Sequence, residues 1–101
     1  MSAIFEKVMV PTSLFPLGRC VATPGALAAL VSSCQLPTSF LARHARGDWG
    51  VVSPEDKAAN DAALEADERL FSSYTLSSGE TLWIITEWDR SATTLLLPDE
   101  Y

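Results

Sequence analysis

The last third of the chain most constrains the fold, because it contains three strand-like segments separated by turn signals. In "RLFSSYTL" the residues alternate between two faces, with Leu70, Ser72, Tyr74 and Leu76 on one and Phe71, Ser73 and Thr75 on the other. "TLWIITEW" and "TTLLLP" are rich in strand-forming residues, while the intervening "SSGE" and "DRSA" are typical of turns. The pattern predicts a three-stranded antiparallel meander over residues 69–97, with "TLWIITEW", the most apolar segment, at the centre.

Two short helices are predicted before this region. "TPGALAALVSSC" begins with Thr23 as an N-cap and Pro24 at the first helical position, where the missing N–H costs nothing. We expect this helix to end near Cys34. "PTSFLARHARG" predicts a second helix, from residue 38 or 39 to Arg46, because Gly47 suits the left-handed conformation that often ends a helix.

The segment "SPEDKAANDAALEADERL" predicts a third, longer helix, with Ser53 as its cap and acidic residues in its positively polarised first turn. Small residues mark the side expected to face inward: Ala58, Ala59, Ala62, Ala63 and Ala66. An acidic stripe marks the outward side: Asp61, Glu65 and Glu68. Like charges at this spacing repel each other weakly, so a stripe kept despite the repulsion points to a partner surface.

The beginning of the chain gives weaker signals. Residues 3–10 are compatible with a strand or a short helical turn, residues 11–18 contain two prolines and are predicted to be irregular or an edge strand, and residues 19–22 predict a short strand. A chain of 101 residues corresponds to one domain. We therefore expect residues 1–101 to form a single α+β domain, in which two or three short helices pack on an antiparallel sheet built mainly from the C-terminal meander.

The formal net charge of −6 is distributed unevenly along the chain. Residues 1–53 contain four basic and two acidic residues, a net charge of +2, whereas residues 54–101 contain three basic and eleven acidic residues, a net charge of −8. The acidic half would repel nucleic acid, which is bound through several cations. It would attract a basic protein surface that normally binds nucleic acid. The alternative is that the acidic residues only keep a small domain soluble.

The sequence contains no motif for catalysis, metal binding or cofactor binding. The single histidine, His44, has no nucleophile motif beside it, and a phosphate-binding loop, a paired-histidine motif and a dinucleotide fingerprint are all missing. Glu87 and Asp89 form a carboxylate pair, but carboxylates beside a turn are more often solvated than catalytic. Cys20 and Cys34 lack metal-ligand spacing and are expected to be reduced and largely buried. We expect no enzymatic activity, no metal and no cofactor.

The sequence favours a cytoplasmic location. Its apolar runs are far shorter than the ~20 residues that span a bilayer. Its first residues, "MSAIFEKVMVPTS", do not follow the pattern of a secretory signal.

The stretch "RHARGDWG", residues 43–50, gathers three basic residues in an otherwise acidic chain. The simpler interpretation is a helix C-terminus, where cations complement the negative end of the helix and Trp49 folds back over its apolar side. The alternative is a nucleic-acid-binding site, in which Arg43, His44, Arg46 and Trp49 hold a single strand through charge and stacking.

The turn sequence "TEWDRSATT", residues 86–94, is dense in hydrogen-bonding groups, of which Asp89 and Ser91 suit a capped hairpin turn. Three tryptophans are many for this length, and at least one is expected to be exposed, where tryptophan is a favoured interface anchor. We predict a partner-binding surface that joins the acidic stripe to this turn: Asp61, Glu65, Glu68, Glu87, Trp88, Asp89 and Arg90.

Two segments of the chain resemble a family of small proteins that occur on plasmids and integrated mobile elements. These segments are "LARHARGDWG–SPEDKAANDAAL" and "RLFSSYTLSSGETLWIITEWDRSATTLLLPDEY". The resemblance covers residues 40–101, and "RHARGDWG" and "ITEWDRSATTLLLPDEY" are its most specific parts. It implies no established activity, catalytic residue or cofactor. The usual form of the family has Ala at the position of Trp88, so this chain would carry an additional aromatic side chain on its surface.

The resemblance implies a direction for the function, because small acidic proteins of mobile elements often block host defences. Anti-CRISPR and anti-restriction proteins are similar to this chain in size and charge, and they need only a surface that occupies a nucleic-acid-binding or nuclease-recruiting site. The expectation is a protein-binding inhibitor of a host defence complex, with no direct nucleic-acid partner and no membrane partner. Three alternatives stay open: a nucleic-acid-binding accessory protein that uses Arg43, Arg46 and Trp49, a small enzyme or modification-system subunit with His44 as acid–base, and an interaction module without a defence role.

Overall fold

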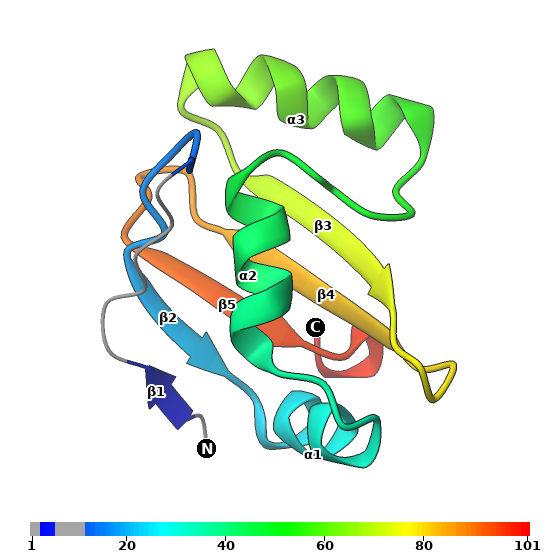
Figure 1. Ribbon diagram of the computed structural model, residues 1–101. Coiled ribbons are helices and arrows are strands. Elements are labelled where there is room, and N and C mark those ends of the chain that lie inside the picture. Colours follow the sequence, from blue (N-terminus) through cyan, green and yellow to red (C-terminus); the bar gives the residue numbers. More distant parts are fainter. Residues whose placement is uncertain (1–2, 6–11) are drawn as a thin grey trace.

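A five-stranded mixed sheet organises the fold (Figure 1). A computed structural model describes residues 3–5 and 12–101. The strands are β1 (Ala3–Phe5), β2 (Arg19–Ala22), β3 (Leu70–Thr75), β4 (Thr81–Thr86) and β5 (Ala92–Leu96), in the spatial order β1-β2-β5-β4-β3. The helices are α1 (Pro24–Ser32), α2 (Pro37–Ala45) and α3 (Pro54–Ala66), followed after the last strand by the 3-10 helix η1 (Pro98–Glu100). The α+β class and the three helices predicted from the sequence are confirmed.

The C-terminal meander is also confirmed. β3 pairs antiparallel with β4, and β4 pairs antiparallel with β5. β5 pairs in parallel with β2, which pairs antiparallel with β1. β4 is thus the middle strand of the meander, as expected, but β5 is the central strand of the complete sheet. A parallel pairing between segments some seventy residues apart leaves no local sequence pattern, which is why the predicted sheet lacked it.

The beginning of the chain agrees with its weaker signals where it is described. The short strand predicted for residues 19–22 is β2, and residues 12–18 form irregular structure. In the predicted strand or turn over residues 3–10, the first three residues form β1, while residues 6–10, together with residue 11, lie outside the described residues.

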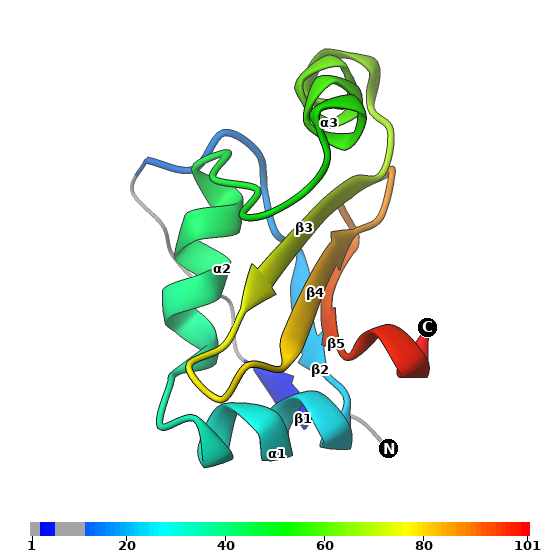
Figure 2. The same ribbon diagram turned by 90° about the vertical axis from the view of Figure 1, so that its right-hand side faces the viewer.

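The helices cover the sheet unequally (Figure 2). α2 crosses one face, α1 lies at one end, and α3 lies beyond the β3 edge. The short helix η1 lies on the face opposite α2. The face toward α2 therefore carries the core, and the opposite face is covered by much less structure.

Each helix begins with a proline, as predicted for α1, whereas α2 begins at Pro37, just before its predicted start at residue 38 or 39, and ends at Ala45, one residue before the predicted Arg46. Thr23 accepts a hydrogen bond at 3.1 Å from the Ala26 backbone N–H, and Ser53 accepts one at 3.1 Å from the Asp56 N–H. Gly47, after α2, adopts the predicted left-handed conformation with φ of 82°. In the described part of the chain, no single helix is long and apolar enough to span a membrane. Taken together, α1 and α2 would be long and apolar enough, but they are bent by 107° relative to each other.

One cysteine differs from expectation. Cys20 is buried in β2, as predicted, but Cys34 is exposed. α1 ends at Ser32, and Cys34 follows in a left-handed conformation with φ of 56°, which turns the chain toward α2. Cys34 thus lies beyond the helix, and the prediction that both thiols are largely buried was wrong for it.

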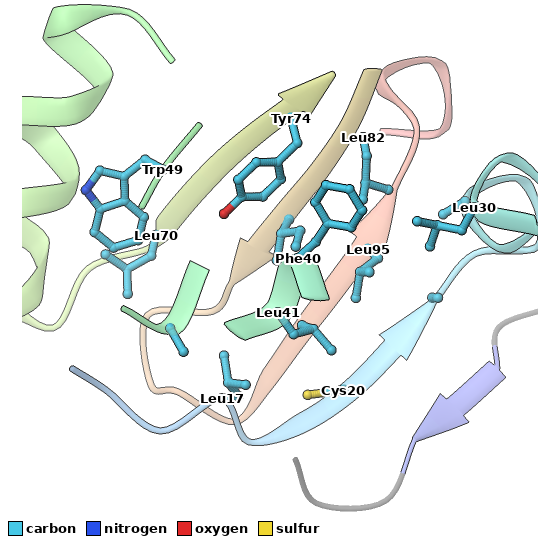
Figure 3. Packing of buried hydrophobic residues seen from close by; sticks show 14 of the residues in the cluster. Leu17, Cys20, Leu30, Phe40, Leu41, Trp49, Leu70, Tyr74, Leu82 and Leu95 are labelled. Atoms are coloured by element: carbon cyan, nitrogen blue, oxygen red, sulfur yellow. The ribbon is translucent and has the colours of Figure 1, made fainter. Parts of the chain in front are cut away.

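The core lies between α2 and the sheet (Figure 3). The strand side chains of this core layer come from even-numbered positions of β3 and β4, including Leu70, Tyr74 and Leu82, in the alternation predicted for β3. Phe40 and Leu41 of α2 pack onto them from above. A side chain of this size contributes roughly 1.5–3 kcal/mol when it is fully buried, so this layer supplies most of the stability that the sheet and α2 share.

The inward side of α3 was predicted wrongly. Of the five alanines assigned to it, only Ala63 is buried; the others, Ala58, Ala59, Ala62 and Ala66, are exposed. The second buried residue of the helix is Asn60. α3 lies beside the edge of the sheet instead of on its face, so a narrow stripe is sufficient to hold it.

Asn60 holds α3 against the sheet by imitating a neighbouring strand. Its side chain accepts a hydrogen bond from the Phe71 N–H at 3.0 Å and donates one to the Phe71 carbonyl at 2.6 Å. Two residues further along β3, the Ser73 N–H donates to Trp49 O at 3.0 Å and the Ser73 carbonyl accepts from the Val51 N–H at 2.7 Å. These contacts occupy the outward backbone groups at two positions of β3, which protects an edge that could otherwise pair with another chain.

We expect Asn60→Ala to lower the free energy of unfolding by about 2–3 kcal/mol, because it leaves two backbone groups of Phe71 without partners. Chemical denaturation measures the change. The exposed substitution Glu65→Ala on the same helix is the control and should stay within about 0.5 kcal/mol of the parent. Equal stability of the two variants would show that the amide does not hold α3.

Candidate functional site

The single histidine lies at the centre of the core instead of at a site. His44, in the last turn of α2, is 0% exposed. Its Nδ1 lies 2.6 Å from Ser72 Oγ of β3, and its Nε2 lies 2.9 Å from Thr86 Oγ1 of β4. Both ring nitrogens are therefore occupied by hydroxyl groups of the two strands below.

The direction of these hydrogen bonds follows from the far end of the chain of hydroxyls. Thr93 donates to the Leu17 carbonyl at 2.7 Å, which can only accept. The Thr93 oxygen therefore accepts from Thr86, at 2.7 Å, and Thr86 in turn accepts from His44 Nε2–H. By assignment from this network, His44 is the Nε2–H tautomer and Ser72 donates to Nδ1.

This environment fixes the charge of His44. Burial lowers its pKa to about 3, and the positive charge of Arg90 adds to the shift. At neutral pH the ring is uncharged, hydrogen-bonded at both nitrogens and without solvent contact. The geometry gives the acid–base role considered for His44 no route to a substrate.

The rest of the "RHARGDWG" stretch also serves the fold. The Arg43 guanidinium pairs with Asp48 at 2.7 Å and lies 4.6 Å from the centre of the Tyr74 ring. Their mutual hydrogen bond raises the pKa of Arg43 and lowers the pKa of Asp48. Trp49 is 3% exposed and packs against Phe15 and the His44 ring, at centroid distances of 6.2 and 5.5 Å.

Of the four residues proposed as a nucleic-acid site, His44 and Trp49 are thus buried and Arg43 is paired. Of these four residues, only Arg46 is exposed and has no ion pair with another described residue. The interpretation of this stretch as a helix end agrees with the structure, and the cluster does not present a joint surface to a polyanion.

The predicted partner-binding residues divide into two groups. Asp61 is exposed, but it accepts hydrogen bonds from Lys57 at 3.0 Å and from the Trp49 indole N–H at 3.2 Å. These bonds, the one from Lys57 first, lower the pKa of Asp61. Asp61 therefore has structural partners, whereas the side chains of Glu65 and Glu68 form no ion pair with any residue that the structure describes.

The second group comes together at one end of the molecule, where the β4–β5 turn meets the end of α3. Arg90, in this turn, donates to the Ala63 carbonyl of α3 at 2.9 Å and to the Glu68 carbonyl at 2.5 Å. It also donates to the carbonyls of Glu87 and Trp88. One guanidinium therefore ties the turn to the C-terminal end of α3, where the negative end of the helix attracts a cation.

This tie produces an acidic surface around an exposed tryptophan. We name it the acidic Trp88 face, and its residues are Glu65, Asp67, Glu68, Glu87, Trp88 and Asp89, all exposed. Trp88 is 63% exposed and borders a small hollow together with Asp67 and Asp89. Hydrogen bonds from Ser91 lower the pKa of Asp89, so its carboxylate is charged at neutral pH.

Sequence reasoning found most members of this face but missed what builds it. Arg90 was expected to belong to the partner-binding surface, whereas its guanidinium is used inside the fold. Asp67 was not predicted as a member of this face. It ends α3 in a left-handed conformation, with φ of 51°. The hydroxyl partners of His44 were also missed; polar residues at inward positions of β3, β4 and β5 were the available signal.

Within the described residues, no group of three or more His, Cys, Asp or Glu side chains is arranged to hold a metal ion. Comparison with models of protein families, with curated proteins and with solved structures yields no match to this chain. The candidate site is therefore the acidic Trp88 face, on its geometry alone.

We expect the free energy of unfolding to fall as the pH drops below 6.5, by up to about 1.4 kcal/mol per pH unit. In the unfolded chain His44 binds a proton near pH 6.5, whereas the folded chain resists protonation until about pH 3. The stabilisation is present above pH 6.5 and is lost toward pH 3. The window from pH 6.5 to 5 isolates this residue, because the carboxylates with lowered pKa titrate below it. Denaturation curves at several pH values measure the slope, and His44→Gln is expected to be less stable but flat in that window.

We expect Arg90→Gln to destabilise the fold by about 1.5–3 kcal/mol, the range for hydrogen bonds to a charged group. Amide hydrogen exchange should accelerate in the β4–β5 turn and in the last turn of α3. The exposed Arg46→Gln removes the same charge elsewhere and serves as the control. Unchanged exchange at both sites would contradict the role assigned to Arg90.

Proposed function

We propose that this chain is a protein-binding module that docks through the acidic Trp88 face onto a basic surface of another protein. The observation that carries the proposal is the union of two acidic segments around Trp88, a large side chain that is 63% exposed. The face carries five exposed carboxylates, of which those of Asp67 and Asp89 border the hollow beside Trp88, and the cation of the turn, Arg90, has its guanidinium directed into backbone carbonyls.

The chemistry of the face favours a basic protein partner. Clustered carboxylates steer a cationic surface into place and select against anionic ones, nucleic acid included. An exposed tryptophan adds an apolar anchor, and its ring accepts the guanidinium of an arginine by a cation–π contact. Because Arg90 holds both segments in place, little ordering remains to be done on binding, and pre-organisation favours affinity.

We further propose that the partner is a nucleic-acid-binding component of a host defence complex and that docking inhibits it, as in anti-CRISPR or anti-restriction proteins. The support is the resemblance of residues 40–101 to a family from mobile elements, together with a face whose charge imitates that of a nucleic acid. The function needs no chemistry of its own, which agrees with a buried, uncharged His44.

The alternative, a nucleic-acid-binding accessory protein, has less support. Its residues Arg43, Arg46 and Trp49 do not form one exposed patch, because Trp49 is buried and Arg43 is paired with Asp48. A mobility-shift assay with single- and double-stranded DNA at low salt tests it directly, and a shift that Arg46→Gln abolishes would restore it.

The proposed function predicts protection of an invading phage in cells that carry the target defence system. Strains that each hold one CRISPR or restriction system would express the chain, and the efficiency of plaquing would be measured. We expect a rise of at least about tenfold in the strain with the target, a change that a plaque assay resolves clearly. The purified target complex should then lose DNA binding in the presence of the chain.

Variants separate the face from the function. The variant Trp88→Ala with Glu65→Lys and Glu68→Lys should lose protection and partner binding, whereas Glu55→Lys with Glu80→Lys makes the same two reversals at exposed positions outside the face and should keep both. Protection that survives in the first variant would place the docking surface elsewhere. No protection in any strain would overturn the inhibitor proposal.

A further inference from the structure

A second candidate site lies on the sheet face opposite α2. A cavity of about 290 Å³ lies there between α3 and the residues after β5. Its floor contains Phe71 of β3 and Trp83 of β4, and its rim contains Tyr101, Arg69 and Asp56. Asn60 also lines it, but this side chain is already committed to the backbone of Phe71. The volume is at the lower end of the range for small-ligand pockets and suits a single ring system.

Three aromatic rings give the cavity its character. Trp83 lies between the other two, with its centroid 5.2 Å from that of Phe71 and 5.9 Å from that of Tyr101. The planes are nearly perpendicular, at 84° and 75°. Trp83 is only half-buried, although the face toward α2 is fully packed. Edge-to-face rings of this kind offer a planar ligand both stacking and edge contacts.

A cation stands at the rim. Arg69 donates one hydrogen bond, at 2.5 Å, to the Tyr101 hydroxyl, and its guanidinium lies 5.7 Å from the Tyr101 ring centre. No carboxylate of the described residues lies within ion-pair distance of it. A guanidinium has five N–H donors and pairs well with carboxylates and phosphates, so donors remain for an anionic group on a ligand.

We propose that this cavity binds a small planar aromatic anion, whose ring contacts Trp83 and Tyr101 and whose carboxylate or phosphate pairs with Arg69. The Asp56 carboxylate at the same rim accepts a hydrogen bond from an amino or ring N–H group of such a ligand. Both a nucleoside monophosphate and an aromatic carboxylate have this chemistry. The site is separate from the acidic Trp88 face and does not depend on the function proposed for it.

The three tryptophans make the test specific. In a two-dimensional NMR spectrum of the ¹⁵N-labelled full chain, the indole N–H of Trp83 should shift saturably, while those of Trp49 and Trp88 stay in place as internal controls. Adenosine monophosphate and indole-3-carboxylate represent the two sources, and adenosine, indole, acetate and inorganic phosphate separate ring from charge. We expect one of the two anions to bind with Kd below about 1 mM and the single-feature compounds to bind at least about tenfold more weakly.

Substitutions at the exposed Arg69 complete the test without disturbing the core. Arg69→Gln should weaken binding by at least about tenfold, the loss of one charge-assisted hydrogen bond, whereas Arg69→Lys should retain much of it and the matched Arg46→Gln all of it. Binding of the phosphate or of the carboxylate alone supports the proposal and identifies the source. The proposal is overturned if neither anion shifts the Trp83 signal, if adenosine and indole bind as tightly as the anions, or if Arg69→Gln binds like the parent.

Discussion

The fold depends on placing a polar ring in the middle of an apolar core. His44 brings two nitrogen atoms into a region where an unpaired polar group would cost several kcal/mol. Ser72 and Thr86 satisfy them, and Thr93 and the Leu17 carbonyl continue the chain of hydrogen bonds to the loop before β2. One line of four side chains and a carbonyl thereby connects α2, β3, β4, β5 and that loop. Because Thr86 and Thr93 each both donate and accept, the network fixes the lateral position of α2 over the sheet, which apolar packing alone would leave less determined.

A second constraint concerns the edge of the sheet. β3 would expose its outward backbone groups, but the Asn60 side chain pairs with Phe71, and the segment around Val51 pairs with Ser73. α3 is thus attached by polar contacts at both ends of its packing stripe, Asn60 toward β3 and the Ala63 carbonyl toward Arg90. This explains why an alanine-rich helix buries so few alanines. Its outer side is left free for charge, which is the condition for the acidic Trp88 face.

The sequence predicted the elements well because their signals are local. The proline that opens α1, the caps Thr23 and Ser53, and the alternation in β3 all act within a few residues, and the structure confirms them. What could not be predicted depends on pairs far apart in the chain. The parallel β2–β5 pairing, the bond of Asn60 to Phe71 and the reach of Arg90 into α3 are contacts of this kind. The same reason limited the prediction of the candidate site. The acidic segments and Trp88 were recognisable in the sequence. The Arg90 guanidinium that unites them was assigned to the partner-binding surface, because a sequence does not show which way a turn side chain points.

The two proposed surfaces differ in how far their residues also contribute to the packing of the fold. The acidic Trp88 face is held by four hydrogen bonds of Arg90 to backbone carbonyls, and its exposed members make few contacts that the fold needs. The aromatic cavity is the reverse, because Phe71 and Trp83 belong to the sheet itself, while Arg69, Asp56 and Tyr101 at the rim are exposed. Charge follows the same division: the face has an excess of carboxylates, while the cavity rim has one guanidinium and one carboxylate. A large basic partner therefore complements the first surface, and a small ring with a single anionic group complements the second. The two sites thus select molecules of different size and opposite charge.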